Sequence, residues 1–399
     1  IIVRRKAGAP LMHAGLYVLG GACNESADLA GLTTLMVRTA VKGTQTRGAL
    51  QIAEEAEMLG GSVSGFAGSD SFGWSISVPA RYAAAAIELV ADVAQYPSIE
   101  GAALETERAI AVADVVAQRD DMYRYPMRLA SQAAFAGHAY GSPVGGTEET
   151  LARVTADQVR AWHASSTIVS PAVIALVGDR DPDELAAIAA RAFHAIEHAG
   201  EHALGRALWP SSVSMTAESR DRAQTALAML FPGPARGDDD RFAAHLIATV
   251  ASGLGGRFFD ELRDKRSLCY TVNLFTIDRR AAGAFAAYIA TSPAQESAAR
   301  DGLLAELARL RDEPVRPDEL DRARTYTLGT HAIRQQNGGA VLADIVDAYL
   351  FGTLRELDDY ESNVRAVTAE SMVRVARRYF DAAIRVEGIV RGVAKSGLS

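Results

Sequence analysis

A segment of this sequence occurs twice, and this duplication constrains the fold more than any other feature. A helical pattern followed by an apolar strand runs from Val154 to Val177, and the same pattern runs from Val367 to Val390. In each copy the last residue lies 23 positions after the first, and the copies are offset by 213 positions. Both begin with Val-Thr-Ala and an acidic residue. A repeat of this size predicts two similar domains in one chain.

The start of each copy carries a helix-capping signal. Thr155 and Thr368 are suitable N-cap residues, because a threonine hydroxyl accepts a hydrogen bond from an amide of the first helical turn. Gln158 completes a capping box with Thr155. Upstream, Glu107-Arg108 and Asp321-Arg322 mark the starts of two long helices, 47 and 46 residues before the repeats. We therefore expect the same long helix in both halves.

Glycine and proline interrupt residues 199–212, and we interpret this stretch as a linker. It separates a predicted N-terminal domain, residues 1–198, from a predicted C-terminal domain, residues 213–399. In the first half, four large apolar residues alternate with glycine and serine, as in a half-buried strand: Phe72, Trp74, Ile76 and Val78. Apolar helical patterns flank this strand at residues 50–59 and 83–96. Strands mixed with helices in two copies predict an α+β fold.

Charge and hydropathy exclude several classes of function. The chain has 41 Lys and Arg against 49 Asp and Glu, a net charge of −8, and neither sign forms a block. This pattern argues against a nucleic-acid surface and favours a peptide or protein partner. Apolar runs such as residues 83–87 are broken by Glu88 and Asp92, well short of the ~20 residues of a membrane span. We expect no membrane span in the visible chain.

The cysteines and the first residue bear on the compartment. Cys23 and Cys269 allow at most one disulfide, and we interpret both as small buried apolar residues. The sequence begins at Ile1 without a methionine, so any targeting signal would lie in a processed leader. Between the bacterial periplasm and the cytoplasm, we favour the periplasm.

Residues 31–44 read Gly-Leu-Thr-Thr-Leu-Met-Val-Arg-Thr-Ala-Val-Lys-Gly-Thr. This stretch resembles the zinc-binding helix of the insulinase-like (pitrilysin-like) metallopeptidases, in which Gly-Leu-x-His-x-x-Glu-His is followed by Lys-Gly-Thr. The motif works because its two histidines and its glutamate share one helix face, where they bind zinc and activate water. Thr34, Val37 and Arg38 occupy those places here, and none of them can substitute. The resemblance therefore implies a member without zinc in its own chain.

The resemblance extends over nearly the whole sequence. The family's third zinc ligand maps to Asp114, which we interpret as a solvated charge because it lacks the two histidines. Further matches are residues 138–141 with Pro143, and the strand end at residues 177–179. The family implies two duplicated domains, each a mostly antiparallel sheet packed against helices, arranged as a clam shell.

Residues 257–270 are similar to the family segment that contributes an arginine and a tyrosine to substrate binding. Arg263 and Tyr270 hold those places, seven positions apart. Their side chains supply hydrogen-bond donors suited to peptide carbonyls or to a developing oxyanion. The resemblance therefore implies that Arg263 and Tyr270 bind substrate. The residues alone also allow a surface arginine on a charged helix and a tyrosine in the core.

A literal His-x-x-Glu-His occurs at His194, Glu197 and His198. It resembles an inverted zinc-protease motif, but it lies where the first half ends, and no helical glutamate follows at the required distance. We interpret it as a solvated helix end, which together with His202 could bind metal only adventitiously.

These observations predict a non-catalytic, substrate-binding subunit of a heteromeric zinc metalloendopeptidase. A homologous partner would supply the zinc, while Arg263 and Tyr270 would contact a peptide or an unfolded protein. No cofactor and no independent activity are expected of this chain. Two alternatives stay open: an inactive structural scaffold in a larger complex, and a stand-alone peptide-binding homodimer.

Overall fold

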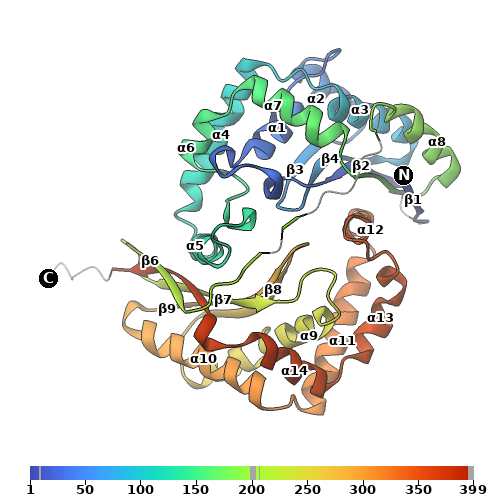
Figure 1. The fold of residues 1–399 in the computed structure, drawn as a ribbon. Coiled ribbons are helices and arrows are strands. Elements are labelled where there is room, and N and C mark those ends of the chain that lie inside the picture. Colours follow the sequence, from blue (N-terminus) through green and yellow to red (C-terminus); the bar gives the residue numbers. More distant parts are fainter. Residues whose placement is uncertain (9, 198–203, 206, 394–399) are drawn as a thin grey trace. The chain divides into compact units, whose positions relative to one another are not determined.

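The computed structural model describes residues 1–8, 10–197, 204–205 and 207–393 (Figure 1). These residues form two compact units, and neither unit is continuous in sequence. Unit 1 comprises residues 1–116, 142–204 and 332–357, and unit 2 comprises residues 117–141, 205–331 and 358–399. Much of the predicted linker, including residues 199–203 and 206, lies outside the described residues.

Unit 1 is built on a five-stranded sheet in the order β1-β5-β2-β4-β3. Only the β1–β5 pairing is parallel. Its strands are β1 (Ile2–Arg5), β2 (Leu11–Leu19), β3 (Val63–Ala67), β4 (Ser71–Pro79) and β5 (Ala172–Gly178). Its helices are α1 (Leu32–Ala40), α2 (Ala49–Met58), α3 (Ala83–Gln95), most of α4 (Gly101–Gln118), α6 (Glu148–Arg153), α7 (Ala156–His163), α8 (Pro182–Ala192) and α12 (Gly338–Leu350).

Unit 2 repeats this plan in a sheet of order β6-β10-β7-β9-β8, with only β6–β10 parallel. Its strands are β6 (Ser214–Arg220), β7 (Thr225–Gly233), β8 (Thr271–Asp278), β9 (Gly283–Thr291) and β10 (Val386–Gly392). Its helices are α5 (Arg124–Ala134), α9 (Arg241–Ala251), α10 (Glu296–Asp312), most of α11 (Pro317–Arg334), most of α13 (Glu356–Ala366) and α14 (Ala369–Tyr379). The predicted α+β fold with two duplicated, mostly antiparallel sheets is confirmed.

The repeated helix–strand segments have the predicted local structure. Thr155 and Thr368 cap α7 and α14, and both form capping boxes, with Gln158 and Ser371 respectively. The long helices α4 and α11 begin at Gly101 and Pro317, several residues before the predicted starts.

The predicted pairing of these long helices is also wrong by two residues. Arg108 donates to the carbonyl of Val154, and Arg324 donates to the carbonyl of Val367, the equivalent residue in the second copy. Arg108 therefore corresponds to Arg324 and not to Arg322.

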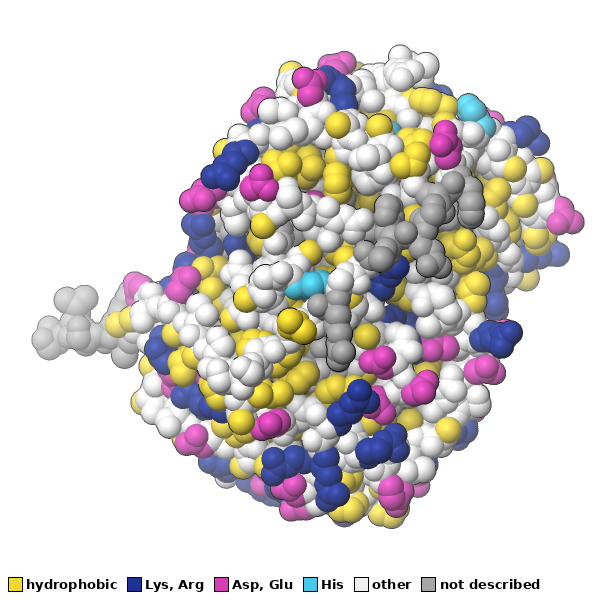
Figure 2. Space-filling model, in the orientation of Figure 1, with side chains coloured by type: hydrophobic (Ala, Val, Ile, Leu, Met, Phe, Trp, Pro, Cys, Tyr) yellow, Lys and Arg dark blue, Asp and Glu magenta, His cyan; other side chains and the backbone are white. Residues whose placement is uncertain are grey.

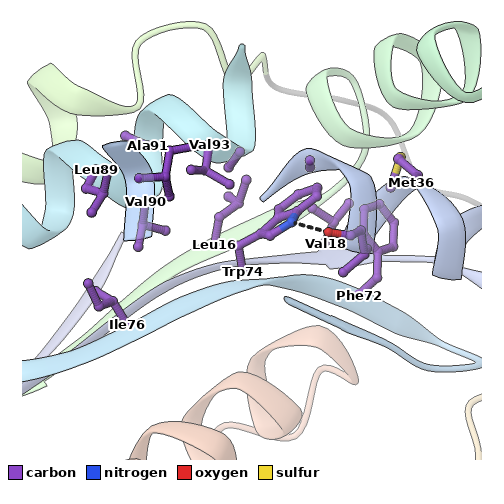
Figure 3. Packing of buried hydrophobic residues seen from close by; sticks show 14 of the residues in the cluster. Leu16, Val18, Met36, Phe72, Trp74, Ile76, Leu89, Val90, Ala91 and Val93 are labelled. Carbon is purple, nitrogen blue, oxygen red and sulfur yellow. Dashed lines mark hydrogen bonds between the residues drawn. The ribbon is translucent and has the colours of Figure 1, made fainter. Parts of the chain in front are cut away.

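The core of unit 1 confirms the predicted strand. Phe72, Trp74, Ile76 and Val78 of β4 are at most 2% exposed. In Figure 3, Trp74 and Ile76 lie below the side chains of α3, and Phe72 lies near Met36 of α1. The Trp74 indole donates a 3.1 Å hydrogen bond to the carbonyl of Val37, so the one polar group of this ring is satisfied inside the core.

Each sheet carries, on its other face, a helix from the opposite half of the sequence. Helix α12 packs on β5 and β2 of unit 1, and buries five apolar side chains there: Val341, Leu342, Ile345, Val346 and Leu350. This burial contributes on the order of 10 kcal/mol before conformational entropy is subtracted. Helix α5 packs on β10, β7 and β6 of unit 2. Gly388 permits that approach, since a Cβ there would lie 2.1 Å from the Pro126 carbonyl oxygen.

Two predictions concern the whole chain: charges of both signs without a block of either, and no membrane span. No helix in the described part of the chain is long and apolar enough to cross a bilayer. Side chains of both charge signs are interspersed over the face seen in Figure 2.

Candidate functional site

Helix α1 keeps the frame of the zinc helix but uses its side chains for packing. The Glu25 carboxylate accepts the amides of Gly31 and Thr33 at 2.8 and 2.6 Å, which caps the helix start. The Thr34 hydroxyl donates to the Val144 carbonyl at 2.7 Å. Val37 is 2% exposed and belongs to the core. Neither residue is placed or suited to hold a metal.

Arg38 and Asp114 form an ion pair on the surface of unit 1. Their Nη2 and Oδ2 atoms lie 2.5 Å apart, and the side chains are 34% and 58% exposed. Asp114 is largely exposed, as expected of a solvated charge, and it is also paired with a cation. A fixed guanidinium charge now lies beside the carboxylate that corresponds to a zinc ligand in the family. Such a charge opposes the binding of a divalent cation, so zinc does not fit this site.

The second histidine motif is likewise occupied by other contacts. One ring nitrogen of His194 lies 3.0 Å from the Tyr96 hydroxyl, and the other lies 3.3 Å from the Arg191 carbonyl. Glu197 is exposed, while His198 and His202 lie outside the described residues. Within the described ranges, no group of three or more His, Cys, Asp or Glu side chains is arranged to hold a metal ion.

Arg263 and Tyr270 lie side by side in unit 2. Arg263 is on a π-helical turn, η6 (Phe259–Lys265), and Tyr270 directly precedes β8. The Arg263 guanidinium carbon is 4.1 Å from the ring centre of Phe259 and 5.4 Å from that of Tyr270. The guanidinium therefore makes cation–π contacts with both rings, which restrict its position.

Both side chains remain available to a ligand. Tyr270 is 76% exposed, so the alternative that places it in the core is wrong. The nearest carboxylate oxygen to Arg263, that of Asp264, is 3.9 Å away. Among the described residues, neither the Arg263 guanidinium nor the Tyr270 hydroxyl has a hydrogen-bond acceptor. The pair can therefore offer several donors to one acceptor group, such as a peptide carbonyl or carboxylate.

The turn between the two residues is tightly fixed. The amide of Ser267 donates to the Arg263 carbonyl at 2.9 Å, and Ser267 has a φ of 49°, in the left-handed region. The Thr291 hydroxyl donates to the Leu268 carbonyl at 2.6 Å. Burial raises the pKa of the Cys269 thiol to about 11, so this cysteine stays protonated at neutral pH. These contacts set the spacing between Arg263 and Tyr270.

A buried ion pair anchors the start of the same segment to α11. Arg257 and Glu319 are joined by two hydrogen bonds of 2.9 and 2.8 Å, and their side chains are only 8% and 3% exposed. The hydrogen bonds from Arg257 hold the pKa of Glu319 down to about 2. The carboxylate therefore stays charged throughout the neutral range, and the segment stays attached.

Sequence reasoning missed a further contact at β8, the edge strand that follows Tyr270. The Ser252 hydroxyl donates to the Leu274 carbonyl at 2.7 Å and accepts the Leu274 amide at 2.6 Å. One serine thus satisfies both outward-facing backbone groups of Leu274. The only signal in the sequence was the glycine-rich stretch that follows Ser252, residues 253–256.

Comparison with known proteins gives the family. Residues 1–148 match the family described as Insulinase (Peptidase family M16), and residues 153–326 match the Peptidase M16 inactive domain. An uncharacterized zinc protease of Streptomyces coelicolor is 25% identical over 372 residues, which cover 91% of this chain and 81% of that protein. An uncharacterized zinc protease of Mycobacterium tuberculosis is 28% identical over 315 residues, covering 74% and 72%.

Solved structures share the fold over the full length. The peptidase M16 inactive domain from Pseudomonas fluorescens superposes with a TM-score of 0.89 at 20% identity, covering 98% of this chain and 95% of that one. A chain of Complex III2 from Candida albicans superposes with a TM-score of 0.84 at 16% identity, covering 100% and 94%. Taken with the residues that replace the zinc ligands, Thr34, Val37 and Arg38, these matches show that the chain belongs to the insulinase-like peptidase family M16, as a non-catalytic member without the zinc motif.

Proposed function

We propose that this chain is the substrate-binding subunit of a heteromeric zinc metalloendopeptidase, in which Arg263 and Tyr270 contact peptide beside the zinc site of a homologous partner. The observation that carries this proposal is the pairing, on a fixed turn of unit 2, of the exposed Tyr270 with the half-buried Arg263, whose N–H donors have no hydrogen-bond acceptor among the described residues. Relatives named as zinc proteases support the reaction class. The partner supplies the metal and its water, since α1 of this chain does not fit zinc.

The chemistry of the pair suits a peptide backbone. A guanidinium offers five N–H donors in a rigid plane, and a phenol offers one O–H donor. Directed at one carbonyl, these donors orient the scissile bond and stabilise negative charge that develops on its oxygen. The aromatic contacts of Arg263 reduce the freedom that it loses on binding. Arg263 and Tyr270 would therefore lower both KM and the barrier to the partner's reaction.

Reconstitution tests the proposal. The isolated chain should be inert, and a mixture with a zinc-bearing homologue should cleave peptides. The double variant Arg263→Ala, Tyr270→Ala should lower kcat/KM of the mixture about 100-fold or more, given the cost of removing oxyanion donors. A matched control is Arg322→Ala, Tyr326→Ala, which removes one exposed arginine and one exposed tyrosine from α11, outside the turn that carries the pair.

Three outcomes would count against the proposal, and two of them would favour an alternative. Full activity of the Arg263, Tyr270 double variant, with assembly intact by gel filtration, would remove the assigned role. A mixture that assembles without cleaving any peptide would favour a structural scaffold, a role consistent with the shared fold of the Complex III2 chain. Tight peptide binding by the isolated chain would instead favour a stand-alone binding module.

A further inference from the structure

Strand β6 is an open edge of the sheet in unit 2. It pairs only with β10, and it lies at the end of the strand order. The amide of Ser214 donates to the Arg385 carbonyl, and the carbonyl of Arg220 accepts the Val393 amide. Even-numbered residues of β6 therefore direct their backbone groups towards β10. By strand alternation, Met215, Ala217 and Ser219 direct theirs outwards.

These outward groups have no partner among the described residues. Met215, Ala217 and Ser219 are all exposed, and none of their backbone amides or carbonyls takes part in a hydrogen bond with the described part of the chain. Three N–H and three C=O groups in a row are a template for another strand. An edge of this kind is normally either protected against pairing with another chain or covered by a further strand.

The internal repeat supplies a comparison for this edge. Strand β1 is the corresponding edge strand in the sheet of unit 1, and it runs parallel to the strand that it pairs with, β5. It has four residues and ends in Arg4 and Arg5, with Lys6 directly after, and such charges are a usual protection of free edges. Strand β6 has seven residues, Ser-Met-Thr-Ala-Glu-Ser-Arg, with neither lysine nor proline. β6 carries two charged side chains, Glu218 and Arg220, but it is the longer strand and its charges are of opposite sign, so this edge is less protected than that of β1.

The sequence of β6 is self-complementary in one antiparallel register. With Ala217 opposite Ala217 of a second copy, Met215 faces Ser219 and every outward amide meets a carbonyl. Three residue pairs of this kind make six hydrogen bonds. Glu218 then faces Thr216, and Arg220 faces Ser214. A register shifted by two positions has one hydrogen-bonded residue pair fewer. In one direction the shift also places Glu218 opposite Glu218 of the second copy, and facing like charges are destabilising.

We propose that β6 is an interface with a second copy of this chain, joined across a two-fold axis at Ala217 to form a continuous ten-stranded sheet. Besides the hydrogen bonds, the contact would cover the exposed apolar side chains of Val213 and Met215, which are 41% and 50% exposed. A two-fold axis makes the contact closed, since each copy uses the same strand.

The helix layers leave room for this contact. On one face of the sheet, α5 packs most extensively on β10, the second strand from the edge. In the paired arrangement the two β10 strands are three strand spacings apart, about 14 Å. Packed helices need about 8 to 10 Å between axes. The two copies of α5 would therefore lie beside each other without overlap.

Charged substitutions of Ala217, the residue on the proposed two-fold axis, test the proposal on the full chain. Sedimentation velocity at about 1 to 100 µM should show a dimer for the parent protein. Ala217→Lys and Ala217→Glu should each be monomeric, because like charges face each other at the axis, and an equimolar mixture should again be dimeric. Ala217→Pro removes an outward N–H donor, which an edge strand does not need for pairing within its own sheet. This variant should raise the dissociation constant of the dimer at least about tenfold.

A disulfide test fixes the register. Ala217→Cys should form a covalent dimer under mild oxidation, since paired residues across an antiparallel ladder lie about 5.5 Å apart at Cα. Ser219→Cys is the matched control, because in this register it faces Met215 and not itself. A parent protein that is monomeric at 100 µM, or a dimer that survives both Ala217→Lys and Ala217→Pro, would overturn the proposal. Equal crosslinking of the two cysteine variants would overturn the register.

Discussion

The buried ion pair of Arg257 and Glu319 gives a quantitative prediction for the segment that carries Arg263. The hydrogen bonds from Arg257 hold the pKa of Glu319 at about 2, against an ordinary value of 4.5. Because the folded-state pKa is the lower one, the pair stabilises the fold above pH 4.5 and loses that contribution as the pH falls towards 2. At about 1.4 kcal/mol per pH unit, the gap corresponds to about 3 kcal/mol at neutral pH.

We expect Glu319→Gln to lower the free energy of unfolding by about 3 to 5 kcal/mol at pH 7, because it also leaves the Arg257 charge buried without a carboxylate. The difference between the parent and the variant should shrink by about 1 kcal/mol at pH 4 and by about 2 kcal/mol at pH 3. Urea titrations followed by circular dichroism at these pH values measure it. Amide hydrogen exchange in residues 257–270 should be faster in the variant.

The control for this experiment is an exposed ion pair. Asp312 pairs with Arg311 at 2.8 Å, but the side chains are 55% and 38% exposed. Asp312→Asn should therefore leave the unfolding curve unchanged within error. If the stability difference for Glu319→Gln were the same at pH 7 and pH 3, the depressed pKa of Glu319 would not be the source of the stabilisation, and the reasoning would be refuted.

Two further predictions concern the former zinc helix and the edge of β8. The double variant Thr34→His, Arg38→His should bind one zinc ion per chain by elemental analysis, since α1 keeps its frame and Asp114 lies beside position 38, whereas Arg38→His alone should not. Absence of zinc from a folded double variant would show that the frame has changed. Ser252→Ala should lower the free energy of unfolding by about 1 to 3 kcal/mol, because it removes both hydrogen bonds to Leu274. Ser252→Thr should restore most of the loss. Equal stability of Ser252→Ala and the parent would refute this prediction.

The parts of the fold that were predictable from sequence depend on neighbours along the chain. Capping at Thr155 and Thr368 needs only residues three positions away, and the alternation through Trp74 needs only the local period of a strand. The absence of the zinc motif is read from three residue identities within one helix, Thr34, Val37 and Arg38. Each of these features has its full cause inside a short window of sequence.

What could not be predicted depends on distant partners. The apolar face of α12 indicates a buried helix, but periodicity does not say which sheet will cover it. The ion pair of Arg38 with Asp114 joins residues 76 positions apart. Serine at position 252 is an ordinary helix-end residue until β8 is placed beside it. Only the folded chain brings these groups together.

The contrast between Arg38 and Arg263 is the strongest structural reason to assign a role to the second. Arg38 meets the carboxylate of Asp114 at 2.5 Å, so its charge is already used within the chain. Arg263 is held by two aromatic rings, and its nearest carboxylate is at 3.9 Å. An aromatic ring fixes the position of a guanidinium without occupying its N–H donors. This difference supports the proposal that Arg263 meets an acceptor outside the described part of the chain, such as a peptide carbonyl.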